Sequence, residues 1–148
     1  MSVESAWNEI EAEHQLLGEK LTAVVRLCPA RETRTDCEGC PHAHSHQCST
    51  ILQDMVGDLL GYMVSHFRHE EALMRNWGLM NHARDRCDRH MEDHGDISEA
   101  FGELAGALHG NNPLPRVRDI HALLMGWLGT HIDEHDHPML ELLAKADR

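Results

Sequence analysis

The sequence lacks an apolar run near the roughly 20 residues that a membrane-spanning helix needs. Its first residues, Met1 to Glu4, lack the basic and apolar regions of a secretory signal. An excess of basic charge is also absent, because 13 Lys and Arg stand against 25 Asp and Glu, for a net charge of −12. Such a chain is a poor partner for nucleic acid or for an anionic membrane surface. We therefore expect a cytoplasmic protein that binds neither.

The cysteine count argues against disulfides, and the histidine count points to metal chemistry. Five cysteines, an odd number, without a secretory signal indicate a reducing compartment rather than a disulfide framework. At 148 residues the chain is long enough to bury its own core, so residues 1–148 are expected to form a single domain. The unusual number is 14 histidines, which indicates metal or pH chemistry.

Four segments carry apolar residues at alternating steps of three and four, the period of one helix face, and strand-like alternation is absent. They span about 3–27, 50–76, 81–108 and 117–138, with a short helix after the last. Thr50 and Gln53 fit a capping box at the start of the second segment, and residues 110–115 read as a turn. The shared pattern predicts an all-α fold, an antiparallel up-down-up-down four-helix bundle with a short C-terminal helix.

Each of the four segments places at least one histidine on its apolar stripe. These stripe histidines are His14, His66, His90, His94 and His131. Glu70 lies one turn after His66 on the same stripe, and a buried carboxylate costs several kcal/mol unless it is compensated. The pairs His66/Glu70 and His90/His94 each place two metal-ligand side chains on one helix face.

Any one stripe histidine could be a core residue hydrogen-bonded to a neighbour. Together with Glu70, however, they would each need a partner in an interior supplied mostly with Leu, Val and Met. A metal satisfies all of them at once, which favours a metal centre. Asp136 is a further candidate ligand. It follows His131 by five residues, about 140° around a regular helix, so it reaches inward only if the helix loosens before Pro138.

The motifs around these residues resemble those of the hemerythrin family. They are Ile10-Glu11-Ala12-Glu13-His14, His66-Phe67-x-x-Glu70-Glu71-x-Leu73-Met74, His90-x-x-x-His94 and His131-Ile132-x-x-x-Asp136. The resemblance implies a four-helix bundle that holds two iron ions in an oxo- or hydroxo-bridged, non-haem centre. It implies that His14 and His66 serve one iron and that His90, His94 and His131 serve the other. Glu70 and Asp136 would then bridge the two ions.

The resemblance also implies where oxygen would bind. Imidazoles, carboxylates and the bridging oxygen fill all but one position around two octahedral irons, which leaves one for O2 or for a mimic such as azide or nitric oxide. A donor set of nitrogen and oxygen without thiolates suits iron. The residues expected around the open position are Met63, Phe67, Trp127, Leu128 and Ile132. In similar proteins an apolar surround without a proton donor favours reversible binding over O–O cleavage. We therefore expect an O2-binding protein rather than an enzyme, without catalytic residues.

A second di-iron interpretation stays open. Glu11-x-x-His14 and Glu134-x-x-His137 match the Glu-x-x-His pattern of ferritin-like carboxylate proteins, which would make the chain a di-iron oxidase or peroxidase. That scheme requires further inward glutamates, and it leaves four of the five stripe histidines without a role.

Residues 29–48, between the first two helical segments, form a Cys/His-rich loop insertion without an apolar period. Its chemistry-bearing residues, together with the preceding cysteine, are Cys28, Cys37, Cys40, His42, His44, His46 and Cys48. Three interpretations are open. The loop is a second metal site, with zinc as the ion, a thiol switch in which Cys37 and Cys40 oxidise reversibly, or a polar loop whose cysteines have no role. The fifth cysteine, Cys87, lies on an apolar stripe and is expected in the core.

The insertion also bears on the biological role. Small bacterial proteins similar to hemerythrin are either free-standing O2 carriers or sensory modules attached to signalling outputs. By that analogy, a cysteine-rich appendage fits an O2 or redox sensor better than a carrier. The chain shows no output domain, so a sensor would act on a signalling output domain or protein outside it. An adaptor that responds to metal or thiol state through the Cys-rich loop is a further alternative. The long helices leave surface for such a partner or for a homodimer.

Overall fold

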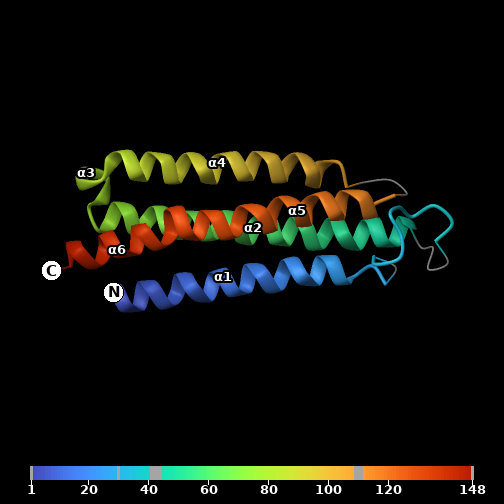
Figure 1. Ribbon diagram of the computed structural model, residues 1–148, viewed down its shortest axis with the longest axis horizontal. Coiled ribbons are helices and arrows are strands. Elements are labelled where there is room, and N and C mark those ends of the chain that lie inside the picture. The colour runs from blue at the N-terminus through green and yellow to red at the C-terminus, as the bar shows by residue number, and fades with distance from the viewer. Residues whose placement is uncertain (1, 30, 41–44, 109–111, 148) are drawn as a thin grey trace.

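The computed structural model of the chain is a bundle of long helices (Figure 1). It describes residues 2–29, 31–40, 45–108 and 112–147, without the side chains of 45–47. Within these ranges no strand occurs. The elements are α1 (Val3–Arg26), α2 (Ser45–Asn76), α3 (Leu79–His82), α4 (Arg84–Gly106), α5 (Leu114–His131), the π-helical turn η1 (Ile132–Asp136) and α6 (His137–Ala146).

The long helices run alternately in opposite directions. α1 runs away from the end that holds both termini, α2 returns, α4 runs away again, and α5 with α6 returns to that end (Figure 1). α1 contacts α2, α2 contacts α4, α4 contacts α5, and α5 closes the ring against α1. The predicted all-α, antiparallel up-down-up-down bundle with a short C-terminal helix is therefore confirmed.

The start of α2 and the course of the third predicted segment differ from the prediction. α2 begins at Ser45 rather than near residue 50, so Thr50 and Gln53 lie inside the helix and form no capping box at its start. Packing explains the extension, because Ser49 is buried and donates its hydroxyl to the Leu108 carbonyl (3.4 Å). The predicted segment 81–108 is divided at Ala83, whose φ of −141° and ψ of 45° separate α3 from α4.

A π-helical turn lies where the sequence suggests that the last helix loosens. In η1 the N–H of His137 donates to the Ile132 carbonyl, five residues earlier instead of four. The wider turn brings Asp136 back to the helix face that carries His131, and both side chains are buried. Pro138 lies in the first turn of α6, where a missing N–H costs little. The fourth predicted segment therefore consists of α5 and η1, and the predicted short C-terminal helix is α6.

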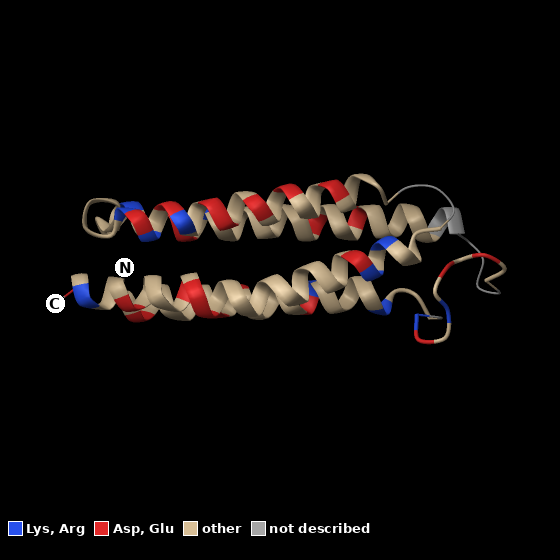
Figure 2. Ribbon diagram, turned by 45° about the horizontal axis from the view of Figure 1, so that its top comes forward, with Lys and Arg blue, Asp and Glu red and all other residues tan. Residues whose placement is uncertain are grey.

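Two apolar clusters flank the middle of the bundle. The larger cluster lies toward the Cys-rich loop and includes Leu59, Phe101 and Ile120, whereas the smaller cluster lies toward the termini and includes Ile10 and Leu140. Cys87 packs in the smaller cluster, as expected for a core cysteine. Figure 2 shows acidic residues spread along the long helices. None of the helices within the described ranges combines the length and apolar content that crossing a membrane requires.

The larger cluster generates a prediction about stability. Phe101 is fully buried, so Phe101→Ala removes its ring contacts and leaves a cavity, and we expect the free energy of unfolding to fall by about 3–5 kcal/mol. Met125 is 56% exposed and serves as the control, because Met125→Ala should change that free energy by less than about 0.5 kcal/mol. Denaturant unfolding of the metal-free proteins measures both, and equal losses would contradict the packing described here.

Candidate metal centre

The structure brings the seven predicted ligand side chains together between the two apolar clusters. They are His14 from α1, His66 and Glu70 from α2, His90 and His94 from α4, His131 from α5 and Asp136 from η1. None of them is more than 7% exposed to solvent. The placement follows from register, because each helix carries its inward polar residues at the same distance along the bundle axis.

The donor atoms form two groups that share both carboxylates. Within each group, one donor atom of every residue lies within 4.8 Å of the others. The five-residue group is Glu70, His90, His94, His131 and Asp136, and the four-residue group is His14, His66, Glu70 and Asp136. Three imidazoles therefore lie on one side of the carboxylates and two on the other.

Each shared carboxylate turns one oxygen toward each group. Asp136 Oδ2 lies 2.6 Å from His14 Nε2, whereas its Oδ1 lies 2.8 Å from His131 Nε2. Glu70 Oε1 contacts His66 Nε2, and its Oε2 lies 2.7 Å from His90 Nε2. Both carboxylates are thus oriented as bridges between two positions where an ion would lie.

The Nε2 atoms of the three imidazoles in the five-residue group lie close together. His131 Nε2 lies 3.3 Å from His90 Nε2 and 3.2 Å from His94 Nε2. Neighbouring ligand atoms that each lie about 2.1 Å from an octahedral metal ion are about 3.0 Å apart, so the observed spacing is close to that of a metal site. Among the described residues, both Glu70 oxygens are buried without a well-aligned hydrogen bond, although imidazole nitrogens lie close to them. Aligned hydrogen bonds from the described residues leave both Glu70 oxygens unpaired, whereas a cation between the two groups would satisfy them. The residues present therefore fit bound metal.

Three further carboxylates hold the outward nitrogens of the imidazoles. His66 donates from Nδ1 to Glu13 (2.6 Å), His94 donates from Nδ1 to Glu71 (3.1 Å), and His131 donates from Nδ1 to Asp93 (2.5 Å). Each bond fixes the tautomer that leaves the Nε2 lone pair pointing into the centre. Sequence reasoning missed these three carboxylates. The available signal was their position, because each is adjacent in sequence to a predicted ligand.

At the centre, the neighbouring carboxylates affect the pKa values of two imidazoles more than burial does. Burial opposes protonation of the imidazoles, yet the hydrogen bond with Glu13 and the close Glu70 carboxylate raise the pKa of His66 to about 9. The neighbouring Asp136 and Glu70 carboxylates likewise overcome burial and raise the pKa of His131 to about 10. The same contacts hold the pKa of Glu70 well below its usual value, against the effect of burial. Without metal, protons on the imidazoles balance the carboxylates, and metal binding would displace those protons.

Apolar side chains cover the imidazoles on the side of the larger cluster. Phe67 stacks on His94 with ring centroids 4.0 Å apart, and Trp127 stacks on His131 with centroids 4.4 Å apart. A cavity of about 20 Å³ adjoins them, lined by Leu17, Leu21, Leu59, Met63, Leu124, Trp127 and Leu128. Of the five residues predicted near the open position, Met63, Trp127 and Leu128 line this cavity, whereas Phe67 and the half-buried Ile132 of η1 do not.

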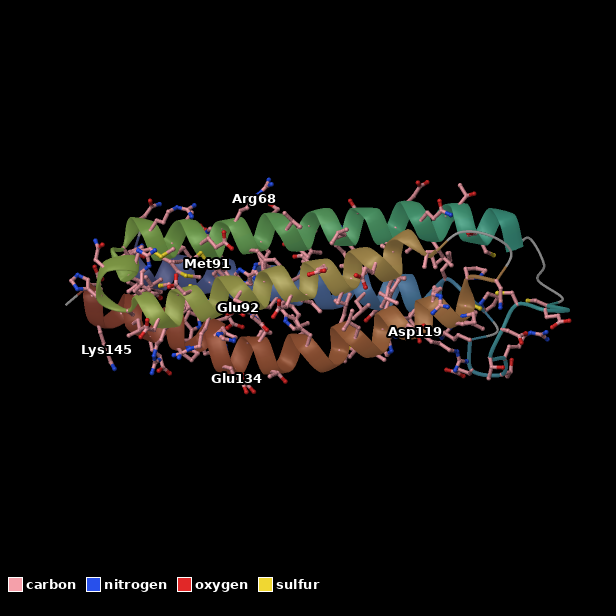
Figure 3. All side chains as sticks on the ribbon, turned by 90° about the horizontal axis from the view of Figure 1, so that it is seen from above. Arg68, Met91, Glu92, Asp119, Glu134 and Lys145 are labelled. Atoms are coloured by element: carbon pink, nitrogen blue, oxygen red, sulfur yellow. The ribbon has the colours of Figure 1, made fainter. Side chains whose placement is uncertain are left out.

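The glutamates of the ferritin-like alternative lie outside the centre. Glu11 accepts a hydrogen bond from His137 Nε2 (2.8 Å) at the surface of the bundle. Glu134 is exposed and projects away from the helices (Figure 3). Of the residues in those two motifs, only His14 belongs to the buried cluster.

The Cys-rich loop lies at the opposite end of the bundle from the termini (Figure 1). There Cys28, Cys37, Cys40 and Cys48 line a common pocket. His42 and His44 lie outside the described residues, as does the side chain of His46. None of the four cysteines belongs to the buried cluster of histidines and carboxylates.

The raised histidine pKa values predict how metal-free stability depends on pH. In the unfolded chain His66 and His131 lose their protons near pH 6.5, whereas the folded protein keeps them up to about pH 9 and 10. Their contribution is therefore complete below pH 6.5 and is lost as the pH rises through those values. The Tm of chelator-treated protein should fall between pH 6.5 and 10, and metal-loaded protein should show a smaller fall. Parallel curves would contradict this account.

The outer carboxylates predict a loss of metal affinity. Asp93→Ala removes the acceptor that orients His131, so we expect metal affinity to fall about 10–100-fold. Asp96→Ala is the matched control, since Asp96 lies on the same helix and is exposed. Competition with a coloured chelator measures both variants, and similar affinities would remove Asp93 from this role.

A family model described as the hemerythrin HHE cation-binding domain matches residues 5–143, a range that holds all seven predicted ligands. No curated protein and no solved structure shows a significant match to the chain. The match confirms the resemblance that the helix motifs predict, and the buried cluster of histidines and carboxylates is compatible with the cation-binding role of the domain. The chain belongs to the hemerythrin family.

Proposed function

We propose that this chain is a non-haem di-iron protein that binds O2 reversibly. The observation that carries the proposal is the pair of donor groups that share Glu70 and Asp136 inside a member of a cation-binding family. Five imidazoles and two carboxylates, with no thiolate in either group, suit iron rather than an ion that prefers sulfur.

The two donor groups differ in their number of imidazoles, and this difference supports a site for a small ligand. The group with His14 and His66 has one imidazole fewer than the group on the other side of the carboxylates. One coordination position is therefore free for O2 on the side of His14 and His66. When bound, the iron pair supplies the electrons that O2 accepts.

The surroundings of the centre favour binding over turnover. The side chains that line the adjoining cavity are apolar or, for Trp127, already donate their N–H elsewhere, to Asp93 (2.9 Å). The single tyrosine, Tyr62, lies outside the centre with the Lys20 ammonium over its ring. Cleavage of the O–O bond needs protons, and this cavity wall offers none, so O2 would leave as it entered.

A sensory role for the chain extends the proposal. α5 packs against the Cys-rich loop at its start and carries His131 at its end, so one helix joins the loop to the centre. That continuity suits a cytoplasmic O2 or redox sensor that acts on a separate signalling protein or domain, or through a homodimer, better than a carrier. The partner would be protein rather than nucleic acid or membrane.

Iron content and optical spectra test the proposal. The reduced protein should hold two irons per chain, one for each donor group. Admitting air should produce a charge-transfer band that disappears on removal of O2, and azide should give a related band with the oxidised protein. Glu70→Ala removes a shared carboxylate and should abolish both bands, whereas Glu134→Ala, at an exposed position, should keep them.

Two results would contradict the proposal. An iron-free protein after loading under reducing conditions would remove the centre. Rapid catalytic consumption of O2 or peroxide would instead support the oxidase or peroxidase alternative.

A further inference from the structure

Four cysteines that the metal centre does not use line one pocket at the loop end of the bundle. Cys28 follows α1, Cys37 and Cys40 lie in the loop, and Cys48 lies near the start of α2. The other lining residues are aliphatic side chains and prolines from α1, α2 and the segment that begins α5. Segments separated in sequence therefore bring four thiols to one apolar site.

The volume of this pocket limits what it can hold. Its cavity measures about 40 Å³. Pockets for organic cofactors and other small molecules measure roughly 300–1,000 Å³. A single ion fits the smaller volume, whereas an organic cofactor does not.

The loop that carries Cys37 and Cys40 is fastened to the bundle. The Arg118 guanidinium on α5 donates to the carbonyls of Arg31 and Arg34. The backbone N–H of Cys37 donates to Asn112 Oδ1 (2.7 Å), just before α5. These contacts hold the two thiols over the pocket, which argues against an unstructured polar loop with idle cysteines.

Cys37 and Cys40 occupy the two ends of a tight turn. The N–H of Cys40 donates to the Cys37 carbonyl (3.1 Å), and Gly39 has a φ of 65°, which favours glycine. A turn of this kind brings thiols three residues apart to the same side of the chain. The Cys-x-x-Cys spacing is the one found in tetrahedral zinc sites.

The thiols are poorly suited to act as redox nucleophiles. All four are free and partly buried. Burial raises the pKa of the Cys37 thiol, and a charge on any of the other three cysteines would raise it further, although a hydrogen bond with the Leu114 backbone opposes the shift. Neither a histidine nor a basic side chain is among the described lining residues to activate a thiolate. Thiolates at this site would therefore need a cation among them.

We propose that Cys28, Cys37, Cys40 and Cys48 bind one zinc ion in a tetrahedral site that is separate from the iron pair. Zn²⁺ displaces the four thiol protons and leaves a doubly negative site. Two arginines brace the loop around the site, since Arg31 donates to the Cys28 carbonyl (3.1 Å) and Arg34 donates to the Glu38 carbonyl. Among the described residues, the sulfur atoms do not form a group within 4.8 Å of one another. Zinc binding therefore requires the four sulfur atoms to move closer together.

Zinc content under reducing conditions tests the site on the full chain. The wild type should retain one zinc per chain in addition to its iron, and Co²⁺ in its place should give thiolate-to-metal charge-transfer bands. Cys37→Ser and Cys40→Ser should each weaken zinc binding at least about 100-fold. Cys87→Ser is the matched control, because Cys87 lies in the smaller cluster at the other end of the bundle.

Iron content and the rate of thiol alkylation provide two further measurements. The Cys37→Ser and Cys40→Ser variants should keep the iron content of the wild type, so failure of this site is distinguishable from failure of the iron centre. In the wild type, zinc should slow alkylation of all four cysteines, a measurement that requires no variant to fold. Four results would overturn the proposal: a wild type without zinc, equal zinc loss in Cys87→Ser, iron in place of zinc at these thiols, or a Cys37–Cys40 disulfide in the reduced preparation.

Discussion

Two carboxylates in the interior of the bundle impose the requirement that the rest of the structure meets. Glu70 and Asp136 are fully buried, and a buried carboxylate costs several kcal/mol unless positive charge or hydrogen-bond donors compensate it. Imidazoles surround both, and they come from all four long helices. One helix can present only two such side chains on adjacent turns, so the centre exists only when four helices lie side by side.

Because the two carboxylates must be compensated, the stability of the folded protein depends on whether protons or metal ions occupy the centre. Protons on His66 and His131 or metal ions among the donors can balance the two carboxylates, and the two states differ in their response to pH. The apolar clusters on either side are independent of this choice. They bury Phe101, Ile120, Ile10 and Leu140 and hold the register of the helices, so they would keep the bundle assembled while the centre exchanges protons for metal.

Periodicity was enough to predict the helices and the inward histidines, because one spacing determines both. Asp136 was harder, since a regular helix points it away, and only Pro138 hinted at the π-helical turn that brings it inward. Glu13, Glu71 and Asp93 could not be selected, because they lie beside the stripes and the chain has 25 acidic residues. Their role depends on which neighbouring helix each faces. The start of α2 at Ser45 likewise depends on packing of Ser49, which local capping signals do not report.

α5 spans the distance between the cysteine pocket and the metal centre. Its first turn packs Leu114 and Val117 into the cysteine pocket, and its last residue, His131, lies in the centre. The helix between them is a continuous α-helix from Leu114 to His131. The π-helical turn η1 follows it and carries Asp136. Under the proposed sensory role, η1 is where a shift of α5 would change the placement of Asp136 against His131, whose Oδ1 and Nε2 atoms lie 2.8 Å apart.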